Sequence, residues 1–300
     1  MLSGFILSYN YREKFLTKTL SIKRFYLARL ARIYPLHLIM FFAALPFTIH
    51  IFKMNKLLWI AQSFFNLTLT QSFLPKSSIY FSFNGVSWSI SNELFFYLLF
   101  PFLIVLIYKC RNYKVITAII LIMIIPLSVA IMPEEFYFSF FYINPLFRVL
   151  DFIIGILLYF VFEKVKQRKF NYFRLELFSI LLLILFFGLH KGIPDVYRYS
   201  YYYWLPMSLL IFAFSFQGGK ISKILSNSTL LYLGEISFGF YMIHQLIIKY
   251  YFPLFYENKI DNIYAKILVL FVVTVLLSHL SYRFYEKPLN KVIKRKINSK

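Results

Sequence analysis

Long apolar runs separated by short polar segments fill the chain from residue 34 to residue 285. A helix needs about 20 apolar residues to cross the roughly 30 Å of hydrocarbon in a bilayer. The sequence therefore predicts an all-α, polytopic transmembrane helix bundle with about eight full spans and a partial N-terminal one. We expect full spans near residues 34–52, 88–108, 115–132, 143–162, 175–190, 203–217, 230–251 and 265–285.

The composition excludes a soluble globular chain and a disordered one. Hydrophobic residues make up 60% of the sequence and charged residues 15%. Such a chain lacks the polar residues to cover a water-exposed surface, and it is too apolar to stay solvated without folding. The net charge of +21 would suggest nucleic acid as the partner of a soluble protein. Here the basic residues fall between apolar runs, as membrane topology produces, so we expect membrane lipid and no nucleic acid as partners.

The charges between the runs predict the orientation. The segment 10–33 is rich in Lys and Arg and holds one acidic residue, Glu13. Since basic residues collect on the inner side of the membrane, we expect this segment and the basic tail 286–300 to be cytoplasmic. No linker interrupts the array of runs, so residues 1–300 are expected to form one membrane domain. The single cysteine, Cys110, cannot form an internal disulfide.

The stretch 57–75 is apolar but also contains several polar residues. If it crossed the bilayer, the basic loops 109–114 and 163–174 would both lie outside, against the usual distribution of positive charge. We therefore expect this stretch to lie in the membrane interface or to re-enter the bilayer without crossing it. Its polar residues include Gln62, Asn66 and Gln71.

Four ionisable residues are predicted at a similar depth below the outer face. With a rise of about 1.5 Å per residue, Glu93 and Arg148 lie roughly 7 Å below the ends of their spans and His244 roughly 10 Å below. Asp151 lies one turn deeper than Arg148. An ionisable group in a membrane span costs free energy and therefore asks for a reason. A structural ion-pair network, with Arg148 and Asp151 matched at i, i+3, and a polar substrate pocket open to the outside both remain possible.

Two arginines lie at the predicted inner surface. Arg29 and Arg32 are three residues apart, which places both guanidinium groups on one face of a helix. Such a pair suits a phosphorylated ligand, because the planar guanidinium matches phosphate oxygens. Topology alone also collects basic residues here, and the neighbouring Lys23 and Arg24 fit that explanation. The spacing leaves both interpretations open.

Several short strings occur together and in one order. Their order and spacing resemble the bacterial acyltransferase family 3 membrane proteins, which O-acylate cell-surface glycans. The resemblance extends from Met1 nearly to the tail. The strings are Leu2-Ser3-Gly4-Phe5, Arg29-x-x-Arg32-Ile33-x-Pro35, Trp88-Ser89-Ile90-Ser91-Asn92-Glu93 with Phe96-Tyr97 and Phe100-Pro101, Arg148 with Asp151-Phe152-x-x-Gly155, Leu233-Gly234-x-Ile236-Ser237 with Tyr241-x-x-His244, and Glu286-x-Pro288.

This resemblance implies a multi-pass enzyme of the bacterial cytoplasmic (inner) membrane with a cytoplasmic C-terminus. It would move an acyl group, usually acetyl, from cytoplasmic acyl-CoA to a hydroxyl of an envelope or exported glycan. Acetyl-CoA would be a co-substrate, with no permanently bound cofactor and no metal. The matching positions imply that Arg29 and Arg32 bind the CoA end and that Glu93 and His244 take part in catalysis. The residues implied to line the substrate pocket are Trp88, Ser89, Ser91, Arg148, Asp151 and Tyr241.

The chain departs from the family pattern at its start. The family's first helix carries an Arg and the His taken as the catalytic base, and both would precede Met1. We therefore expect the chain to be N-terminally incomplete, with His244 as the residue that could substitute for that base. Two alternatives remain: a lipid-linked sugar transporter or flippase, and an inactive truncated remnant of the acyltransferase. Transporters often show inverted repeats, and no internal repeat is visible in this sequence.

Overall fold

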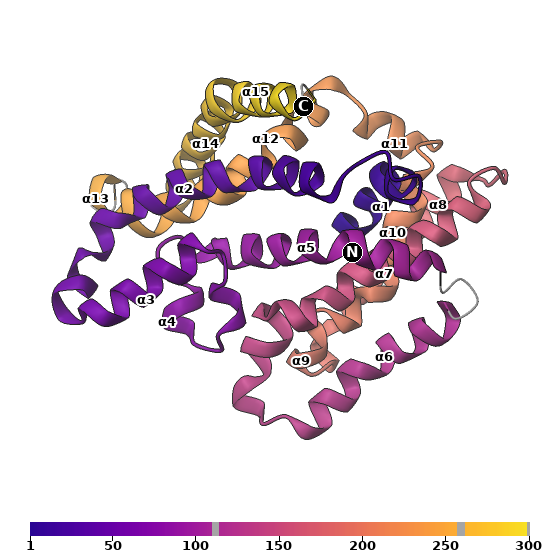
Figure 1. The fold of residues 1–300 in the computed structure, drawn as a ribbon, viewed down its shortest axis with the longest axis horizontal. Coiled ribbons are helices and arrows are strands. Elements are labelled where there is room, and N and C mark those ends of the chain that lie inside the picture. Colours follow the sequence, from indigo (N-terminus) through magenta and orange to yellow (C-terminus); the bar gives the residue numbers. More distant parts are fainter. Residues whose placement is uncertain (110–113, 257–261, 299–300) are drawn as a thin grey trace. The chain divides into compact units, whose positions relative to one another are not determined.

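The computed structural model describes residues 1–109, 114–256 and 262–298, and the regular elements in these ranges are helices (Figure 1). Cys110 lies outside the described residues, as do parts of the basic loop 109–114 and the last two residues of the tail. The chain divides into two compact units. Unit 1 comprises Met1–Ile22 and Phe95–Asn227, and unit 2 comprises Lys23–Leu94 and Ser228–Lys300.

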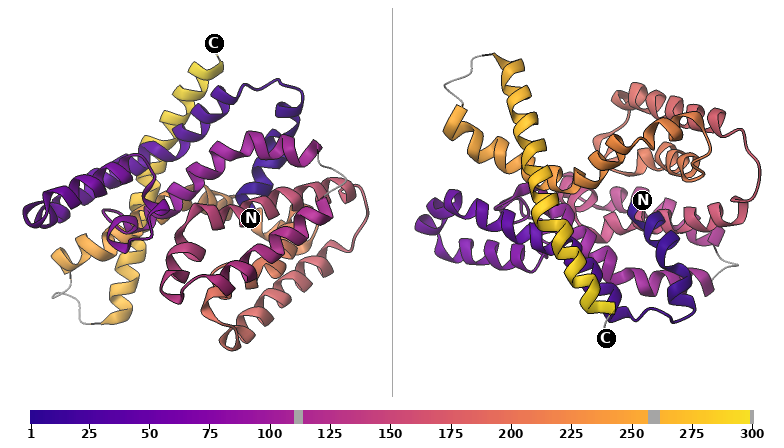
Figure 2. Two further views of the ribbon diagram at one scale, coloured as in Figure 1. Left: turned by 60° about the horizontal axis from the view of Figure 1, so that its bottom comes forward. Right: turned by 90° about the horizontal axis from the view of Figure 1, so that it is seen from above.

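Unit 1 is built from helices that pack antiparallel or cross at close range. Helices α8 and α10 lie side by side, as Figures 1 and 2 show, and α1 packs against α7. Most of α5 also belongs to this unit. The helices are α1 (Leu2–Leu16), α5 (Trp88–Lys109), α6 (Lys114–Ile131), α7 (Pro145–Val165), α8 (Tyr172–Leu189), α9 (Asp195–Arg198), α10 (Trp204–Ser215) and α11 (Lys220–Leu225).

Unit 2 contains the longest helix, α2, and the pair α12 and α14, which pack against each other. The first turns of α5 also belong to this unit. Pro35 and Pro46 lie inside α2, where membrane helices tolerate proline if other groups bind the freed carbonyls. The helices are α2 (Ile22–Met54), α3 (Lys56–Leu67), α4 (Ser77–Tyr80), α12 (Ser228–Leu246), α13 (Phe252–Tyr256), α14 (Ile263–Ser281) and α15 (Lys287–Asn298).

Six helical segments of the described chain are long and apolar enough to cross a membrane. Their outward faces are apolar: in the most apolar window of the segment at 172–192 only 11% of residues are buried inside the protein. Such a surface is stable in lipid and unstable in water, which indicates a multi-pass membrane protein. The segments are Ile22–Met54, Gly85–Lys109, Pro145–Val165, Tyr172–Gly192, Ser228–Leu254 and Ile263–Val292.

The predicted count of eight spans is not confirmed. The run at 115–132 forms a shorter apolar helix, and the run at 203–217 forms α10, whose 12 residues reach only about 18 Å. Short turns precede α10, and the carboxylate of Asp151 binds the side chains of Ser200 and Trp204 there.

The stretch 57–75 forms no membrane-spanning helix, as predicted. Helix α3 has 12 residues, and short turns follow it. Its polar side chains are buried and bind groups of the next segment: Gln62 Nε2 donates to the Ser78 carbonyl at 2.7 Å, and Asn66 Nδ2 to Ser82 Oγ at 2.7 Å. Gln71 Nε2 donates to the Ser87 carbonyl at 3.1 Å. These amides form hydrogen bonds with polar groups of an irregular segment, which apolar side chains could not do.

Two glycines of the family strings lie where α1 crosses α7. A Cβ on Gly4 would clash with the backbone of Phe152, and a Cβ on Gly155 would clash with the backbone of Met1 and Phe5. Small residues at a crossing let two membrane helices approach closely. The glycines in these two strings therefore determine how closely α1 and α7 pack.

Replacing Gly155 by Val is expected to lower the thermal midpoint of the purified protein. Overpacking a close contact costs about 1–3 kcal/mol, and the backbone atoms facing Gly155 cannot rotate away. The matched control is Gly188→Val in α8, where a Cβ would meet nothing within 4 Å. Thermal unfolding in detergent measures both variants, and equal midpoints would contradict the close α1–α7 crossing.

Candidate functional site

In unit 1 the predicted pocket residues Arg148 and Asp151 form an ion pair at the start of α7. Arg148 Nη1 lies 3.0 Å from Asp151 Oδ2, one helical turn away. Helix α7 begins at Pro145, and the side chain of Asn144 caps it by accepting from the Leu146 N–H at 2.9 Å. The cap and the proline fix the first turn, and so they fix where the ion pair lies.

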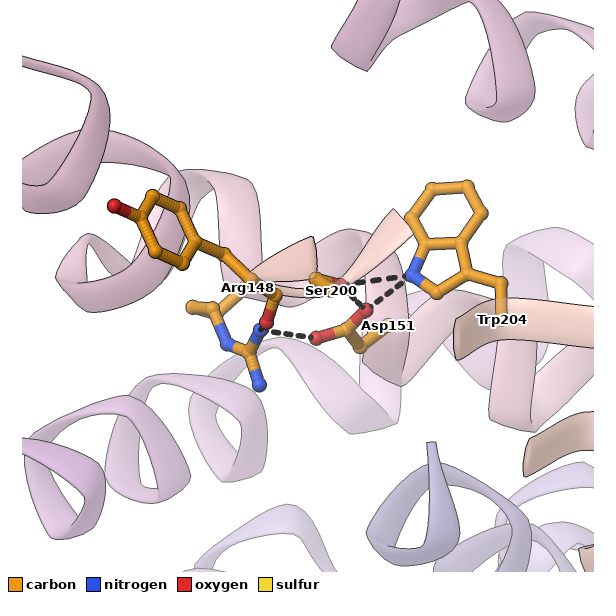
Figure 3. Close-up of polar contacts among 5 residues, drawn as sticks. Arg148, Asp151, Ser200 and Trp204 are labelled. Carbon is orange, nitrogen blue, oxygen red and sulfur yellow. Dashed lines mark hydrogen bonds and ion pairs between the residues drawn. The ribbon is translucent and has the colours of Figure 1, made fainter. Parts of the chain in front are cut away.

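Asp151 binds two further groups that the sequence analysis did not identify (Figure 3). Trp204 Nε1 donates to Asp151 Oδ1 at 2.5 Å, and the Ser200 hydroxyl donates to the same oxygen. Arg148 Nη1 also donates to the Tyr199 carbonyl at 3.2 Å. The buried carboxylate, 7% exposed, thereby receives charge-assisted hydrogen bonds that offset its desolvation.

This cluster lines a cavity of about 760 Å³ inside unit 1. Arg148 and Asp151 thus form the ion pair that their spacing predicted, and the pair also lines a space large enough for a small ligand. The predicted substrate pocket itself stays a prediction. Apolar side chains of α8 and α10 form most of the remaining wall.

In unit 2 the string that begins at Trp88 opens helix α5 directly after the turn Gly85–Ser87. Ser89 Oγ donates to the Val86 carbonyl at 2.9 Å, and Tyr241 OH reaches the same carbonyl at 3.4 Å. Both hydroxyls thus bind the turn, and Tyr241 ties α12 to it. Ser91 is fully buried, and its Oγ has no hydrogen-bond partner among the described residues.

The sequence analysis missed two amides at the same turn. Asn84 Nδ2 donates to the Met242 carbonyl at 2.8 Å. The Gln245 carboxamide lies against Gly85 so closely that a Cβ there would be 2.8 Å from its Oε1. A side chain at position 85 would therefore require the Gln245 carboxamide to shift.

His244 lies on α12 with a defined proton arrangement. Its Nδ1 is 2.7 Å from the Tyr241 carbonyl and 3.2 Å from the Phe240 carbonyl. A carbonyl oxygen can only accept, so Nδ1 carries the proton and Nε2 of the neutral ring holds a lone pair. No described residue binds Nε2. The ring stacks on Phe240 at 6.0 Å with an interplanar angle of 9°, which fixes its orientation.

Glu93 is half-buried on α5, five positions after Trp88. Glu93 and His244 belong to unit 2, whereas Arg148 and Asp151 belong to unit 1. Each pair is described within its own unit. The prediction that all four line one outer pocket therefore stays a prediction.

Arg29 and Arg32 lie one turn apart on α2, as the spacing predicted. The Arg29 guanidinium is 5.9 Å from the centre of the Phe25 ring, and Arg32 is exposed. Arg32 makes no hydrogen bond or ion pair within the described part of the chain, although its charge acts on Glu286. Ser281 Oγ donates to Glu286 Oε1 at 2.9 Å. Arg32 therefore has N–H groups available for an anionic ligand.

Glu176, an ionisable residue in a predicted span, was also missed. It is fully buried on α8 and accepts from the backbone N–H groups of Gly219, Ile221 and Ser222 at 3.0–3.3 Å. Its carboxylate therefore caps the start of α11. An ionisable residue in a membrane span is costly and therefore has a structural or functional role, and this principle would have marked Glu176 as such a residue.

The sequence matches the family model described as acyltransferase domain, acyltransferase family 3, over residues 1–283. Acyltransferase MdmB of Streptomyces mycarofaciens is 30% identical over 273 residues, which are 83% of this chain and 66% of MdmB. O-acetyltransferase OatA of Staphylococcus aureus is 25% identical over 313 residues, which are 97% of this chain and 51% of OatA. The chain thus spans between about half and two thirds of the length of these curated relatives. No solved structure matches the chain.

Proposed function

The chain belongs to the acyltransferase domain family, and we propose that it is a membrane-embedded O-acyltransferase acting on a hydroxyl of an envelope or exported glycan. The donor is acyl-CoA, with acetyl as the acyl group. The names of MdmB and OatA, an acyltransferase and an O-acetyltransferase, support this reaction class. The observation that supports the proposal most is the hydrogen bond between His244 Nδ1 and the Tyr241 carbonyl. Because Nδ1 is bound in this way, Nε2 is left available to accept a proton from a substrate.

On the donor side, Arg29 and Arg32 bind the phosphates of CoA. Their one-turn spacing puts both guanidinium groups on one face of α2, and the exposed Arg32 offers several N–H donors. The basic composition of 10–33 supports a cytoplasmic location for this face, where acyl-CoA is made. By the same distribution of charge, the protein lies in the bacterial cytoplasmic membrane with its C-terminus inside.

On the acceptor side, His244 Nε2 takes the proton of the glycan hydroxyl as its oxygen attacks the thioester carbonyl. The new C–O bond forms, the C–S bond breaks, and the CoA thiolate leaves and recovers the proton from the imidazolium. The products are the O-acyl ester and free CoA, so atoms and charge balance. A positioned general base of this kind contributes about 10²–10⁴ to the rate. Glu93 orients the hydroxyl or stabilises the imidazolium charge.

The test is acetyl transfer by the purified chain in liposomes. With [¹⁴C]acetyl-CoA and a mixture of extracted envelope glycans, we expect label on the glycan that mild base releases, as an ester requires. Saturable binding of acetyl-CoA is expected as well, and a flippase has no use for it. Binding without transfer to any glycan hydroxyl, or no binding at all, would contradict the proposed reaction.

A further inference from the structure

Another cavity lies within unit 2, between α2, α12 and α14. Its volume of about 590 Å³ lies in the range of about 300–1,000 Å³ that is usual for ligand sites. The residues that each helix contributes are three, four or seven positions apart, so they share one face of that helix. The wall includes Leu36, Met40 and Ala43 of α2 and Val269, Val273 and Leu280 of α14.

Hydrogen bonds of two tyrosines mark the ends of this cavity. Tyr251 OH donates to the Ala43 carbonyl at 3.0 Å, and Tyr285 OH donates to the Pro35 carbonyl at 3.5 Å. Both tyrosines line the cavity. Along the lining residues at 269–281, α14 rises about 18 Å. One leaflet contains about 15 Å of hydrocarbon, half of a bilayer, so the cavity has the length of one lipid chain.

The end at Tyr285 carries the charges. Arg32 lies four positions before Leu36, and so it lies on the face of α2 that lines the cavity. It is exposed, and across the described ranges it makes no hydrogen bond or ion pair. Ser281 lines the same end and donates to Glu286 Oε1 at 2.9 Å, and the charge of Arg32 acts on this carboxylate.

The charges of the segments at this end have a positive balance. Glu235 accepts from Tyr282 OH at 2.6 Å, and Lys287 Nζ lies 5.8 Å from the centre of the same ring. Helix α15 begins at Lys287, and its sequence contains no acidic residue. The charged residues at this end are the basic Arg29, Arg32, Arg283 and Lys287 and the acidic Glu235 and Glu286. This balance favours an anion, and the guanidinium of Arg32 matches a phosphate group.

The wall distinguishes a phospholipid from the arm of CoA. In CoA a pantetheine arm with amide groups separates the phosphates from the acyl group, and an amide buried without a partner costs free energy. Between its two tyrosines the cavity is lined by apolar side chains of α2, α12 and α14. In a phospholipid the hydrocarbon chain begins next to the phosphate and the glycerol. A lipid therefore fits a phosphate at Arg32 together with an apolar cavity that begins one turn away.

We propose that this cavity binds one hydrocarbon chain of an anionic phospholipid, whose phosphate contacts Arg32. The basic segments around it attract anionic lipids by the same charge. The inference rests on the proposed function in one respect: Arg32 is also assigned to CoA, so the lipid and acetyl-CoA compete for its guanidinium. Occupation of the cavity would then weaken the binding of the donor in a membrane that is rich in anionic lipid.

The experiment is photo-crosslinking of the full chain in phosphatidylcholine nanodiscs. The probe is phosphatidylglycerol with a diazirine at the methyl end of one chain. We expect its label on peptides that contain residues 251–252 and 269–270, which line the cavity at the end away from Arg32. A diazirine next to the glycerol should instead label residues 280–285. The reverse pattern, or no label at either end, would overturn the proposal.

A comparison of two probes tests the head. Phosphatidylcholine with the same diazirine chain should label about fivefold less than phosphatidylglycerol, the effect of about one Lys or Arg beside an anionic headgroup. Arg32→Gln should remove this difference. Lys23→Gln removes a charge from the same helix, nine positions earlier, and should keep it. Equal labelling by the two probes in the wild type, or a difference that persists in Arg32→Gln, would overturn the assigned head.

A matched pair of variants tests the cavity without altering its charged end. Val273→Trp fills the apolar wall and is expected to lower the labelling about tenfold, the effect of losing about 1.4 kcal/mol of binding. Val272→Trp puts the same ring one position earlier on α14, where the side chain is 44% exposed and does not line the cavity. Its labelling should stay at the wild-type level. Unchanged labelling of Val273→Trp would overturn the proposal.

The labelling needs no acetyl-CoA, so it separates this inference from the proposed function. Labelling without acetyl transfer would contradict the proposed function alone, and acetyl transfer without labelling would contradict this inference alone. Added CoA is expected to lower the labelling of the wild type, because both ligands need Arg32. Labelling that saturating CoA does not lower would contradict the shared use of this guanidinium.

Discussion

Replacing His244 by Gln should lower kcat of acetyl transfer about 100-fold or more, because a positioned general base contributes about 10²–10⁴ to the rate. Gln keeps a donor that can reach the Tyr241 carbonyl, so the packing on Phe240 is largely kept, but no group then accepts the proton at the position of Nε2. The KM for acetyl-CoA should stay near the wild-type value, because the proposed donor site on α2 is not altered. Steady-state transfer from [¹⁴C]acetyl-CoA gives both constants.

The control for this prediction is His279→Gln. His279 lies on α14 in the same unit, and its Nδ1 is bound by Tyr232 OH at 2.6 Å, so the ring has a structural partner. We expect this variant to keep kcat. Equal losses in the two variants would show that His244 acts only through stability, and an unchanged kcat in His244→Gln would remove it from catalysis.

The double variant Arg29→Ala, Arg32→Ala should raise the KM for acetyl-CoA about 100-fold and leave kcat at saturation nearly unchanged. A hydrogen bond to a charged group is worth about 1.5–3 kcal/mol, so the loss of two costs at least about 3 kcal/mol of binding. The change should be confined to KM, because the two arginines are proposed to bind CoA equally strongly in the ground state and in the transition state.

Lys23→Ala with Arg24→Ala is the matched control, because it removes the same number of positive charges from the start of the same helix. This variant should keep the wild-type KM, since Lys23 and Arg24 fit the distribution of charge expected at an inner membrane surface. If both double variants raise KM equally, the general positive charge of 10–33 attracts the donor and the RxxR spacing has no specific role. An unchanged KM in the Arg29, Arg32 variant would exclude them from the CoA site.

Hydropathy predicted the helices whose stability comes from the bilayer. Runs such as 143–162 and 265–285 largely coincide with or lie within segments of the described chain, Pro145–Val165 and Ile263–Val292, that are long and apolar enough to cross the bilayer. Their structure depends on local composition, since each backbone group of a membrane helix is satisfied within its own segment. The spacing of Arg29 and Arg32 and the one-turn pair of Arg148 and Asp151 follow from the same local periodicity.

Hydropathy does not show which polar side chains meet in the fold. Trp204, the first residue of α10, binds Asp151, which lies more than 50 residues earlier in the chain. The role of Glu176 depends on three N–H groups about 45 residues later. The amides of Gln62 and Asn66 looked like interruptions of an apolar run, whereas they bind the following turns. A single sequence does not show which polar residues meet in the folded chain.

The most direct measurement for the central claim is transfer across a sealed membrane. Liposomes that contain the protein would enclose [¹⁴C]acetyl-CoA, with a membrane-impermeant glycan acceptor present only outside. The account predicts ester-linked label on the outer glycan, delivered by molecules whose Arg29 and Arg32 face the lumen. Label that appears only when acetyl-CoA and glycan are on the same side would contradict donor and acceptor sites on opposite faces of one helix bundle.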